Sequence, residues 1–460
     1  MQFISTRGQA PQTSFSDVLL AGLAPDGGLY LPQSWPQFSS DEIAAFKGQR
    51  YQDVAFTILS RFTAGSFRDG ELREAIEAAY VDFDAPQIAP LVDIGNGHYL
   101  LELFHGPTLA FKDIALQVLG QLFSRALARR GGRATIVAAT SGDTGSAAIA
   151  ALGGLPNINV FVMHPKGRVS EVQRLQMTTS AHANVHNIAL EGSFDDAQGI
   201  VKSLFADTAF ASDISLTAVN SINFARIAAQ CVYYFTATAA LGKPATFVVP
   251  TGNFGDIFAG EAASRMGLDV ARLVIATNAN DIMARALNEG LYAAGASHAT
   301  LSPSMDIQVA SNFERALFEA SNRDADWTVA AMNDFAASRR LALPPGVLQA
   351  LRARYSAYAS DDTETRAAIA AVHKETGRII DPHTAVGVAA ARRLGKTPSP
   401  VVVLSTAHPA KFPEAVTQAI GSPPPEPRRL AGMKNLPERL EILGNQPALI
   451  KQFISSRLAG

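Results

Sequence analysis

The residue best suited to covalent chemistry is Lys112, in the stretch ELFHGPTLAFKD at residues 102–113. Leu109, Ala110 and Phe111 precede it, and a Gly-Pro turn precedes these three. Desolvation by such neighbours lowers the pKa of a lysine, and an amine with a pKa near neutrality is a nucleophile for carbonyl groups. By local pattern alone, a lysine that extends its ammonium to solvent at a helix start is the simpler interpretation. The rest of the chain must decide between the two.

Polar loops follow several predicted strands, where open α/β folds bind their ligands. The first, TSGDTG at residues 140–145, combines Ser141, Asp143 and Thr144 with two glycines at a predicted helix start. Hydroxyls and free N–H groups in such a loop suit an anion such as a carboxylate. An ordinary helix start, with Ser141 or Asp143 as the N-cap, is the alternative interpretation.

A second loop, PTGNFGD, occupies residues 250–256 after a predicted strand. It matches neither GxGxxG nor GxxxxGK[ST], so a dinucleotide fold and a Walker-type nucleotide site lose support. A glycine-rich turn that directs backbone N–H groups to one phosphate remains compatible with it. By itself this pattern is weak.

Two further segments carry groups that suit a ligand. In STAHPAK, residues 405–411, a hydroxyl at a strand end can hydrogen-bond a ring nitrogen without strongly stabilising its protonated form. His408 in this loop is either part of a site or a hydrogen-bonded loop residue. Asn220 and Ser221 precede a predicted helix, and Arg226 one turn inside it adds a fork of donors for an anion. A capped helix with one surface arginine is the alternative.

Short runs rich in Val, Ile and Leu alternate with amphipathic helices from Tyr99 onward, which indicates a doubly wound open α/β fold. The predicted strands are 134–139, 159–163, 184–189, 246–249, 273–277 and 401–404, and the predicted helices between them are 144–152, 169–177, 195–206 and 223–241. The opening is predicted to be mostly helical, with one helix from Ser16 to the Ala24-Pro25 boundary. Residues 320–380 are predicted to be helical with a break at Pro344-Pro345, and the last 30 or so to form a helical tail after a linker.

Composition excludes several classes of function. With 39 Lys and Arg against 41 Asp and Glu, the 460 residues carry a net charge of -2, which favours neither nucleic acid nor an anionic membrane. One cysteine excludes an intramolecular disulfide, and the nine histidines lack metal-ligand spacing, so no metal is predicted. No apolar leader or long apolar window occurs, so we expect a cytoplasmic protein of two or three subdomains.

Together, a reactive lysine, a phosphate loop, a hydroxyl for a ring nitrogen and two anion sites describe a pyridoxal-phosphate enzyme. The chain resembles the threonine synthases of the longer bacterial and fungal type, within the tryptophan-synthase-β-like family. The resemblance rests on motifs found in order over some 400 residues: STRG (5–8), DGGLYLP (26–32), ELFHGPTLAFKD, ATSGDTGSAA, NSINFARIAAQ, PTGNFGD, ATNAND (276–281), DPHTAV (381–386) and STAHPAKF.

The resemblance implies a PLP-dependent fold of type II, with two open doubly wound α/β subdomains and an additional, mostly helical N-terminal domain. The implied domains are 1–90 (N-terminal), 91–133 with 216–420 (large, cofactor-binding), 134–215 (small) and 421–460 (C-terminal strap).

It also implies roles for single residues. Lys112 would form the Schiff base with pyridoxal 5'-phosphate and act as the catalytic base, and Thr406 would face the pyridine nitrogen. Asp143 stands where shorter relatives have an asparagine near the phenolic oxygen, and an aspartate can accept there but not donate unless protonated. The remaining assignments are Gly252, Asn253, Phe254, Gly255 and Asp256 around the cofactor phosphate, Ser141 and Thr144 at the substrate carboxylate, and Asn220, Ser221 and Arg226 at the substrate phosphate.

The implied activity converts O-phospho-L-homoserine and water to L-threonine and phosphate. A serine or threonine dehydratase-like lyase on the same fold, and a non-catalytic protein that binds an amino acid or phosphate, remain alternatives. We expect no nucleic-acid or membrane partner, and a monomer or a homodimer, of which the monomer is favoured. The sequence leaves open whether His105 lines the site or braces the Gly106-Pro107 turn.

Overall fold

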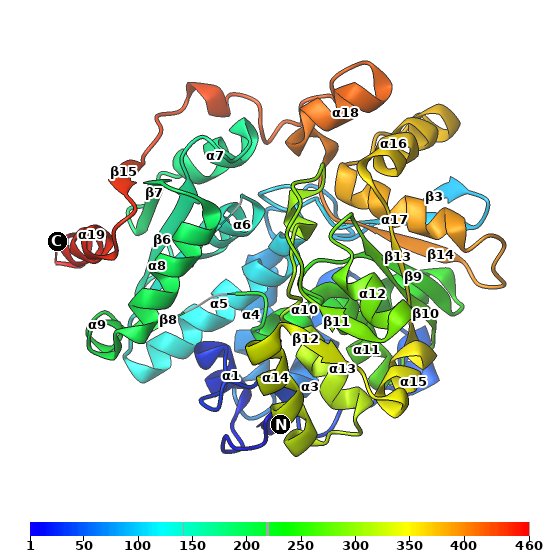
Figure 1. Cartoon of the computed structure of the whole chain (residues 1–460), viewed down its shortest axis with the longest axis horizontal. Coiled ribbons are helices and arrows are strands. Elements are labelled where there is room, and N and C mark those ends of the chain that lie inside the picture. Colours follow the sequence, from blue (N-terminus) through cyan, green and yellow to red (C-terminus); the bar gives the residue numbers. More distant parts are fainter. Residues whose placement is uncertain (141, 218–219, 460) are drawn as a thin grey trace.

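The computed structural model describes residues 1–140, 142–217 and 220–459. Two open sheets with helices on both faces lie side by side, and a mostly helical N-terminal layer packs along them (Figure 1). The predicted doubly wound α/β class is therefore confirmed.

The large sheet has six strands, and all but one neighbouring pair are parallel. In spatial order they are β13 (Tyr355–Ala359), β10 (Val270–Thr277), β9 (Ala245–Pro250), β14 (Val401–Ser405), β4 (His98–Glu102) and the antiparallel edge strand β3 (Leu91–Gly95). Along β14, Val401 and Val403 enter one hydrophobic core while Val402 and Leu404 enter another. Because both faces are buried, the strand is apolar throughout rather than alternating.

Helices cover both faces of the large sheet. On the face of Val401 and Val403 lie α16 (Asp362–Thr376) and α17 (Pro382–Arg393). The core of the other face is built with α10 (Phe224–Leu241), α11 (Gly255–Arg265), α12 (Ile282–Glu289), α13 (Phe313–Ala320), α14 (Ala325–Ser338) and α15 (Pro345–Arg354). A small antiparallel pair, β11 (Leu291–Ala293) and β12 (Arg340–Ala342), and α18 (Pro413–Ile420) complete this lobe.

The small sheet is parallel throughout. Its order is β15 (Glu441–Gly444), β7 (Val185–Glu191), β6 (Ile158–Pro165), β5 (Ala134–Ala139) and β8 (Leu216–Thr217). One face packs on α8 (Phe194–Ala206) and α19 (Pro447–Leu458), and the other on α5 (Lys112–Arg130) and α6 (Asp143–Leu152). Two short helices, α7 (Glu171–Thr178) and α9 (Thr208–Asp213), complete the lobe.

The N-terminal layer comprises β1 (Phe3–Ser5) paired with β2 (Tyr30–Pro32), and α1 (Phe15–Ala21), α2 (Ser40–Ala44), α3 (Tyr51–Thr63) and α4 (Asp69–Tyr80). Polar bonds tie this layer to α13. The hydroxyl of Thr6 donates to Glu314 over 2.6 Å, Arg7 pairs with the same carboxylate at 3.1 Å, and buried Arg315 donates to the carbonyl of Tyr30 over 3.0 Å.

Three predictions at the element level were wrong. The helix expected from Ser16 to Ala24 ends at Ala21, because Gly22 leaves helical geometry with a φ of 69°. The stretch 320–380 contains more than helices separated by Pro344-Pro345, since Tyr355–Ala359 forms the strand β13 at the edge of the large sheet. The expected C-terminal strap and helical tail includes the helix α19 and a 3-10 turn at Met433–Asn435, but it also contains the strand β15, which pairs with β7. The position of β15 at the outer edge of the small sheet is visible in Figure 1.

No helix within residues 1–140, 142–217 and 220–459 is long and apolar enough to cross a membrane.

Phe224, the first residue of α10, joins the N-terminal layer to the large lobe. Its fully buried ring lies 5.2 Å from that of Phe3 and 5.4 Å from that of Phe62. We expect Phe224→Ala to lower the free energy of unfolding by about 3–5 kcal/mol, since it leaves a cavity among aromatic rings. Urea denaturation followed by circular dichroism measures this. The exposed Leu436→Ala is the control, and a Phe224→Ala variant as stable as that control would contradict the packing described.

Candidate active site

Lys112 is fixed at the start of α5 by pairing between two distant loops. The N–H of Phe111 donates to the carbonyl of Thr406 over 2.8 Å, and the N–H of His408 donates to the carbonyl of Leu109 over 3.0 Å. The loop after β14 therefore runs antiparallel to the residues before Lys112. These bonds bring together Lys112 and Thr406, which lie in separate motifs of the sequence.

Asp113 shapes the turn in front of this lysine. Its fully buried carboxylate accepts from the N–H of Thr108 over 2.8 Å and from the Thr108 hydroxyl over 2.6 Å. A Cβ on Gly106 would lie 2.5 Å from the Asp113 side chain, so only glycine fits there. The Gly-Pro turn is thus held by Asp113 rather than by His105.

Asp143, the first residue of α6, is the acceptor on which donors from several elements converge. Its Oδ2 lies 3.6 Å from the Nζ of Lys112 and accepts from the Ser304 hydroxyl over 3.1 Å. Its Oδ1 lies 2.8 Å from the Nζ of Lys411 and accepts from the Gln173 amide over 3.0 Å. The carboxylate therefore links the small lobe to the lysine on α5 and to the loop after β14.

The charges at this junction perturb one another. Burial raises the pKa of Asp143, but the nearby charges of Lys411 and Lys112 outweigh burial and hold that pKa well below its ordinary value. Burial lowers the pKa of Lys112, and this shift is opposed by Asp143 and reinforced by Lys411 and Arg226. An amine whose pKa is lowered is available as a nucleophile and a base.

The loop after β5 partly satisfies its own donors. The Thr140 hydroxyl accepts from the N–H of Gly142 over 3.0 Å and from that of Gly145 over 2.9 Å. The N-cap of α6 is Gly142, not Ser141 or Asp143, and its φ is 139°. A Cβ at this position would lie 2.3 Å from the side chain of Gln173. Ser141 lies outside the described residues, and Thr144 is half-buried in the first turn of α6.

The glycine-rich loop between β9 and α11 presents mainly backbone. A Cβ on Gly252 would lie 2.8 Å from the carbonyl oxygen of Ser304, so glycine is needed for this close approach. Phe254 is the N-cap of α11 with a φ of 64°, and its ring packs on those of Phe313 and Tyr355 in the core. At a helix start such as this one at Gly255, N–H groups have no partner within the helix and suit an anion.

Asp256, at the end of that loop, points its side chain toward α10. Its Oδ1 accepts hydrogen bonds from the hydroxyls of Tyr233 and Tyr234. Burial raises the pKa of Asp256 to about 7, although these two hydroxyls and Arg226 oppose the shift. The carboxyl therefore does not fully neutralise a cation near it at neutral pH.

Arg226 is the cation concerned. Its side chain is buried on α10, and its Nε and Nη1 atoms have no hydrogen-bond partner among residues 1–140, 142–217 and 220–459. Burial lowers the pKa of this guanidinium to about 10, which leaves it charged at neutral pH. A buried guanidinium with free donors is a site for an anion, and the alternative of a surface arginine is excluded.

The residues before α10 are tied to the glycine-rich loop. The amide of Asn312 donates to the carbonyl of Ser221 over 3.1 Å and to that of Asn253 over 3.0 Å. Asn220 accepts the N–H of Ile222 over 3.2 Å, which fixes the turn at its position. Both predicted anion segments thus belong to one connected region.

Four residues at this junction were missed by sequence reasoning: Gln173, Ser304, His383 and Lys411. Ser304 also donates its N–H to His383 Nε2 over 3.2 Å, so His383 Nδ1 carries the proton that is donated to Asp381 over 2.7 Å. The only local signal was that His383 and Lys411 lie inside the motifs DPHTAV and STAHPAKF.

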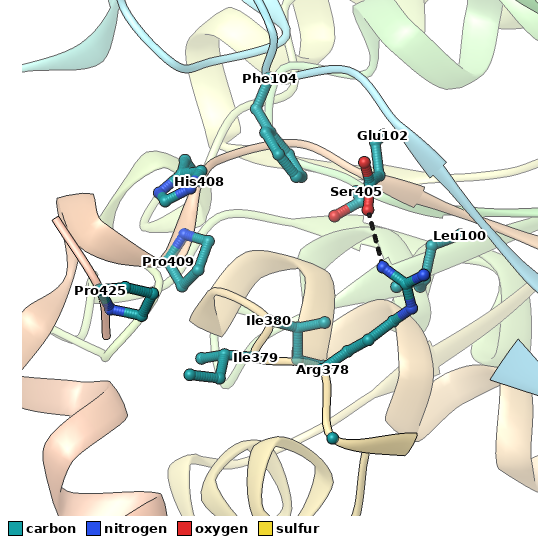
Figure 2. A pocket seen from close by; sticks show the side chains of 11 residues that line it. Leu100, Glu102, Phe104, Arg378, Ile379, Ile380, Ser405, His408, Pro409 and Pro425 are labelled. Atoms are coloured by element: carbon teal, nitrogen blue, oxygen red, sulfur yellow. Dashed lines mark ion pairs between the residues drawn. The ribbon is translucent and has the colours of Figure 1, made fainter. Parts of the chain in front are cut away.

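A separate pocket beside this junction is lined by His408 and by Glu102, the partner of His105. His105 Nε2 lies 2.9 Å from the carboxylate of Glu102, which also lies 3.7 Å from Arg378. Figure 2 shows Glu102 and Arg378 paired on one side of this pocket of about 370 Å³, with His408 and Pro409 on the other side. Burial lowers the pKa of His408 to about 4, so it is neutral, and its Nδ1 accepts from the N–H of Ala410 over 3.1 Å. The lining contains neither Lys112 nor Asp143, so this pocket is not the lysine site.

Comparisons with known proteins find relatives that match this chain over nearly its whole length. Family models match residues 2–80 ("Threonine synthase N terminus"), 84–348 ("Pyridoxal-phosphate dependent enzyme") and 384–454 ("Threonine synthase, C-terminal"). The chain is 49% identical to threonine synthase from Pseudomonas aeruginosa over 99% of its own length and 98% of that protein. The chain belongs to the threonine synthase family.

Solved structures of threonine synthases support the fold as well. The PLP-bound enzyme from Brucella melitensis matches with a TM-score of 0.98 at 48% identity, covering 99% of both chains. The yeast enzyme matches with a TM-score of 0.95 at 37% identity, covering 100% of this chain and 99% of that one. The predicted fold type II is confirmed, and the chain is a PLP-dependent threonine synthase by family.

In this threonine synthase fold, the raised pKa of Asp256 predicts a pH dependence of stability. Between about pH 4 and pH 7 the folded carboxyl holds a proton that the unfolded chain has lost, so the stability it contributes falls as the pH rises through this window. We expect the unfolding free energy of Asp256→Asn minus that of wild type to increase as the pH rises from about 4 to about 7. Urea denaturation without cofactor measures both values. The exposed Asp269→Asn is the matched control. A difference between Asp256→Asn and wild type that does not change with pH would contradict the assignment.

Proposed function

We propose that this chain converts O-phospho-L-homoserine and water to L-threonine and phosphate, with Lys112 as the residue that binds the cofactor and moves protons. The observation that carries the proposal is a buried lysine with a lowered pKa in one region with a buried arginine that has free donors. The first suits covalent attachment and proton transfer, and the second suits a phosphate. Membership of the threonine synthase family supports the same reaction.

The residues fit pyridoxal phosphate. The loop at Gly252, which has no room for a Cβ, and the N–H groups at the start of α11 would hold its phosphate. Thr406, whose backbone is bonded to the residue before Lys112, would face the pyridine nitrogen with its hydroxyl. Phe254 and Asp256 would contribute through their backbone, because their side chains face the core and α10.

Lys112 would carry out the proton transfers of the reaction. Pyridoxal phosphate, when bound, supplies an electron sink that acidifies the C–H bonds near the substrate's amino group. The amine of Lys112 would remove a proton from Cα and then from Cβ, and later return a proton to Cα. Phosphate leaves from Cγ, which gains a proton, and water adds at Cβ.

Arg226, with Asn220 and Ser221, would bind the substrate phosphate and stabilise it as it departs. Thr144, in the first turn of α6, would hold the substrate carboxylate together with Ser141, which lies outside the described residues. Asp143 would face the cofactor as an ionised acceptor, since its pKa lies well below the ordinary value.

We propose further that the chain acts as a monomer in the cytoplasm. The donors around Asp143, which are Lys112, Lys411, Ser304 and Gln173, satisfy its carboxylate without a residue from a second copy, which supports a monomer as the catalytic unit. A single buried cysteine suits a reducing compartment.

We expect Arg226→Ala to lower kcat/KM for O-phospho-L-homoserine by about 10- to 100-fold, because a charged donor to the phosphate is lost. Coupled assays of phosphate release and threonine formation measure this. Deamination of L-threonine, which carries no phosphate, is assayed in parallel and should be affected less. Arg125→Ala on α5 is the matched control, since within the described part of the chain this arginine bonds to Gln121 of its own helix.

We expect Lys112→Ala to lower threonine formation by at least about 100-fold through loss of the catalytic base. Threonine formation at the wild-type rate in this variant, or no phosphate release by the wild-type protein, would rule out the proposed reaction. An equal loss with both substrates in Arg226→Ala would favour a dehydratase instead.

A further inference from the structure

Two buried lysines share one buried carboxylate. Lys411 is fully buried and donates to Asp143 over 2.8 Å and to the carbonyl of Thr108 over 2.7 Å. Lys112 lies at 3.6 Å from the other oxygen of the same carboxylate, beyond normal hydrogen-bond distance. The two amines are therefore not equivalent: Lys411 makes the close ion pair and Lys112 does not.

Charge balance follows from this geometry. A buried carboxylate needs a cation, because burial of an unpaired charge costs several kcal/mol. With Lys411 in place, the pair of Lys411 and Asp143 is neutral as a unit, so Lys112 can lose its proton without leaving an uncompensated anion. Without Lys411, Lys112 would be the nearest remaining cation and would be retained as an ammonium.

The other groups around Asp143 do not make an ion pair with it. Ser304 and Gln173 donate hydrogen bonds to it but are neutral. His383, on α17, also acts on Asp143 electrostatically, but its ring is bonded elsewhere: Nε2 accepts from the Ser304 N–H over 3.2 Å and Nδ1 lies 2.7 Å from the Asp381 carboxylate.

The remaining charged groups near the two lysines lie on other elements. Arg226, on α10, acts on Lys112 as a like charge and has Tyr233 and Asp256 as its own electrostatic partners. The charge of Lys411 also lowers the pKa of Asp113 on α5, against the effect of burial, but the Asp113 carboxylate is bound to the N–H and hydroxyl of Thr108. Neither group replaces Lys411 at Asp143.

We propose that Lys411 is a positioning residue that acts as the permanent counter-ion of Asp143, and that it thereby keeps Lys112 neutral and reactive near neutral pH. The inference rests on the proposed role of Lys112 as the cofactor lysine. It concerns which protonation state Lys112 takes before any substrate is bound.

The test follows the covalent reaction of Lys112 with pyridoxal phosphate, without substrate. The full-length chain is freed of cofactor, pyridoxal phosphate is added at a series of pH values, and the rate of appearance of the visible absorption band is recorded. Because only the neutral amine attacks a carbonyl, the pH midpoint of this rate reports the protonation of Lys112. We expect Lys411→Met to raise that midpoint by about 1–3 pH units, the usual effect of an adjacent opposite charge on a pKa.

Two further variants separate a charge effect from a structural one. Lys411→Arg keeps the cation and should stay closer to wild type than Lys411→Met. The double variant Lys411→Met with Asp143→Asn removes the anion as well, so the midpoint should return toward the wild-type value. A role in packing alone predicts no such return. Lys166→Met, which removes a lysine paired with Glu191 at 3.2 Å on the surface of the small lobe, is the matched control.

An unchanged midpoint in Lys411→Met, or a shift that persists in the double variant, would overturn the proposal. Thermal unfolding checks that each variant is folded. If Lys411→Met does not fold, Asp143→Asn alone decides: with Lys411 left as an unpaired cation, the midpoint should fall below that of wild type, and an unchanged midpoint contradicts the proposal. Because no substrate is present, failure here leaves the proposed reaction standing, and failure of threonine formation leaves this charge pairing standing.

Discussion

The ionised carboxylate of Asp143 is the constraint on which the lysine site depends. Only 4% of this residue is exposed, and a charge so buried is tolerated only when cations and donors surround it. Those partners come from α5, α7, the loop before α13 and the loop after β14. Each must be in place for the charge to be satisfied. The small lobe is thereby held in one position against the large lobe, with Lys112 between them.

The two sheets supply these partners because the carboxyl ends of their strands meet at this junction. The loop that carries Ser304 is held in turn by Asn278, which follows β10. The amide of Asn278 donates to the Asp306 carboxylate over 2.7 Å, and Asp306 also accepts from Asn280 over 3.0 Å. Because this loop also covers Gly252, one polar cluster positions both a donor to Asp143 and a wall of the phosphate loop.

Features that depend on residues close together in the sequence could be predicted from it. Lys112, the loop at 250–256 and most strands follow from apolar runs, glycines and strand ends, and the structure has them there. Lys411, Ser304 and His383 could not be predicted in this way, because their roles arise from contacts between residues more than 75 positions apart. The side chain of Asp256 likewise faces two tyrosines of α10, which no spacing in its own loop indicates.

The central claim is that, of two buried lysines beside one carboxylate, Lys112 is the one that reacts. Reduction of the cofactor-loaded protein with borohydride fixes any lysine–pyridoxal bond, and peptide mapping by mass spectrometry then locates it. We predict a single modified lysine in the peptide that contains Lys112, with the peptide that contains Lys411 unmodified. Modification at Lys411, or at neither lysine, would contradict this account of the site.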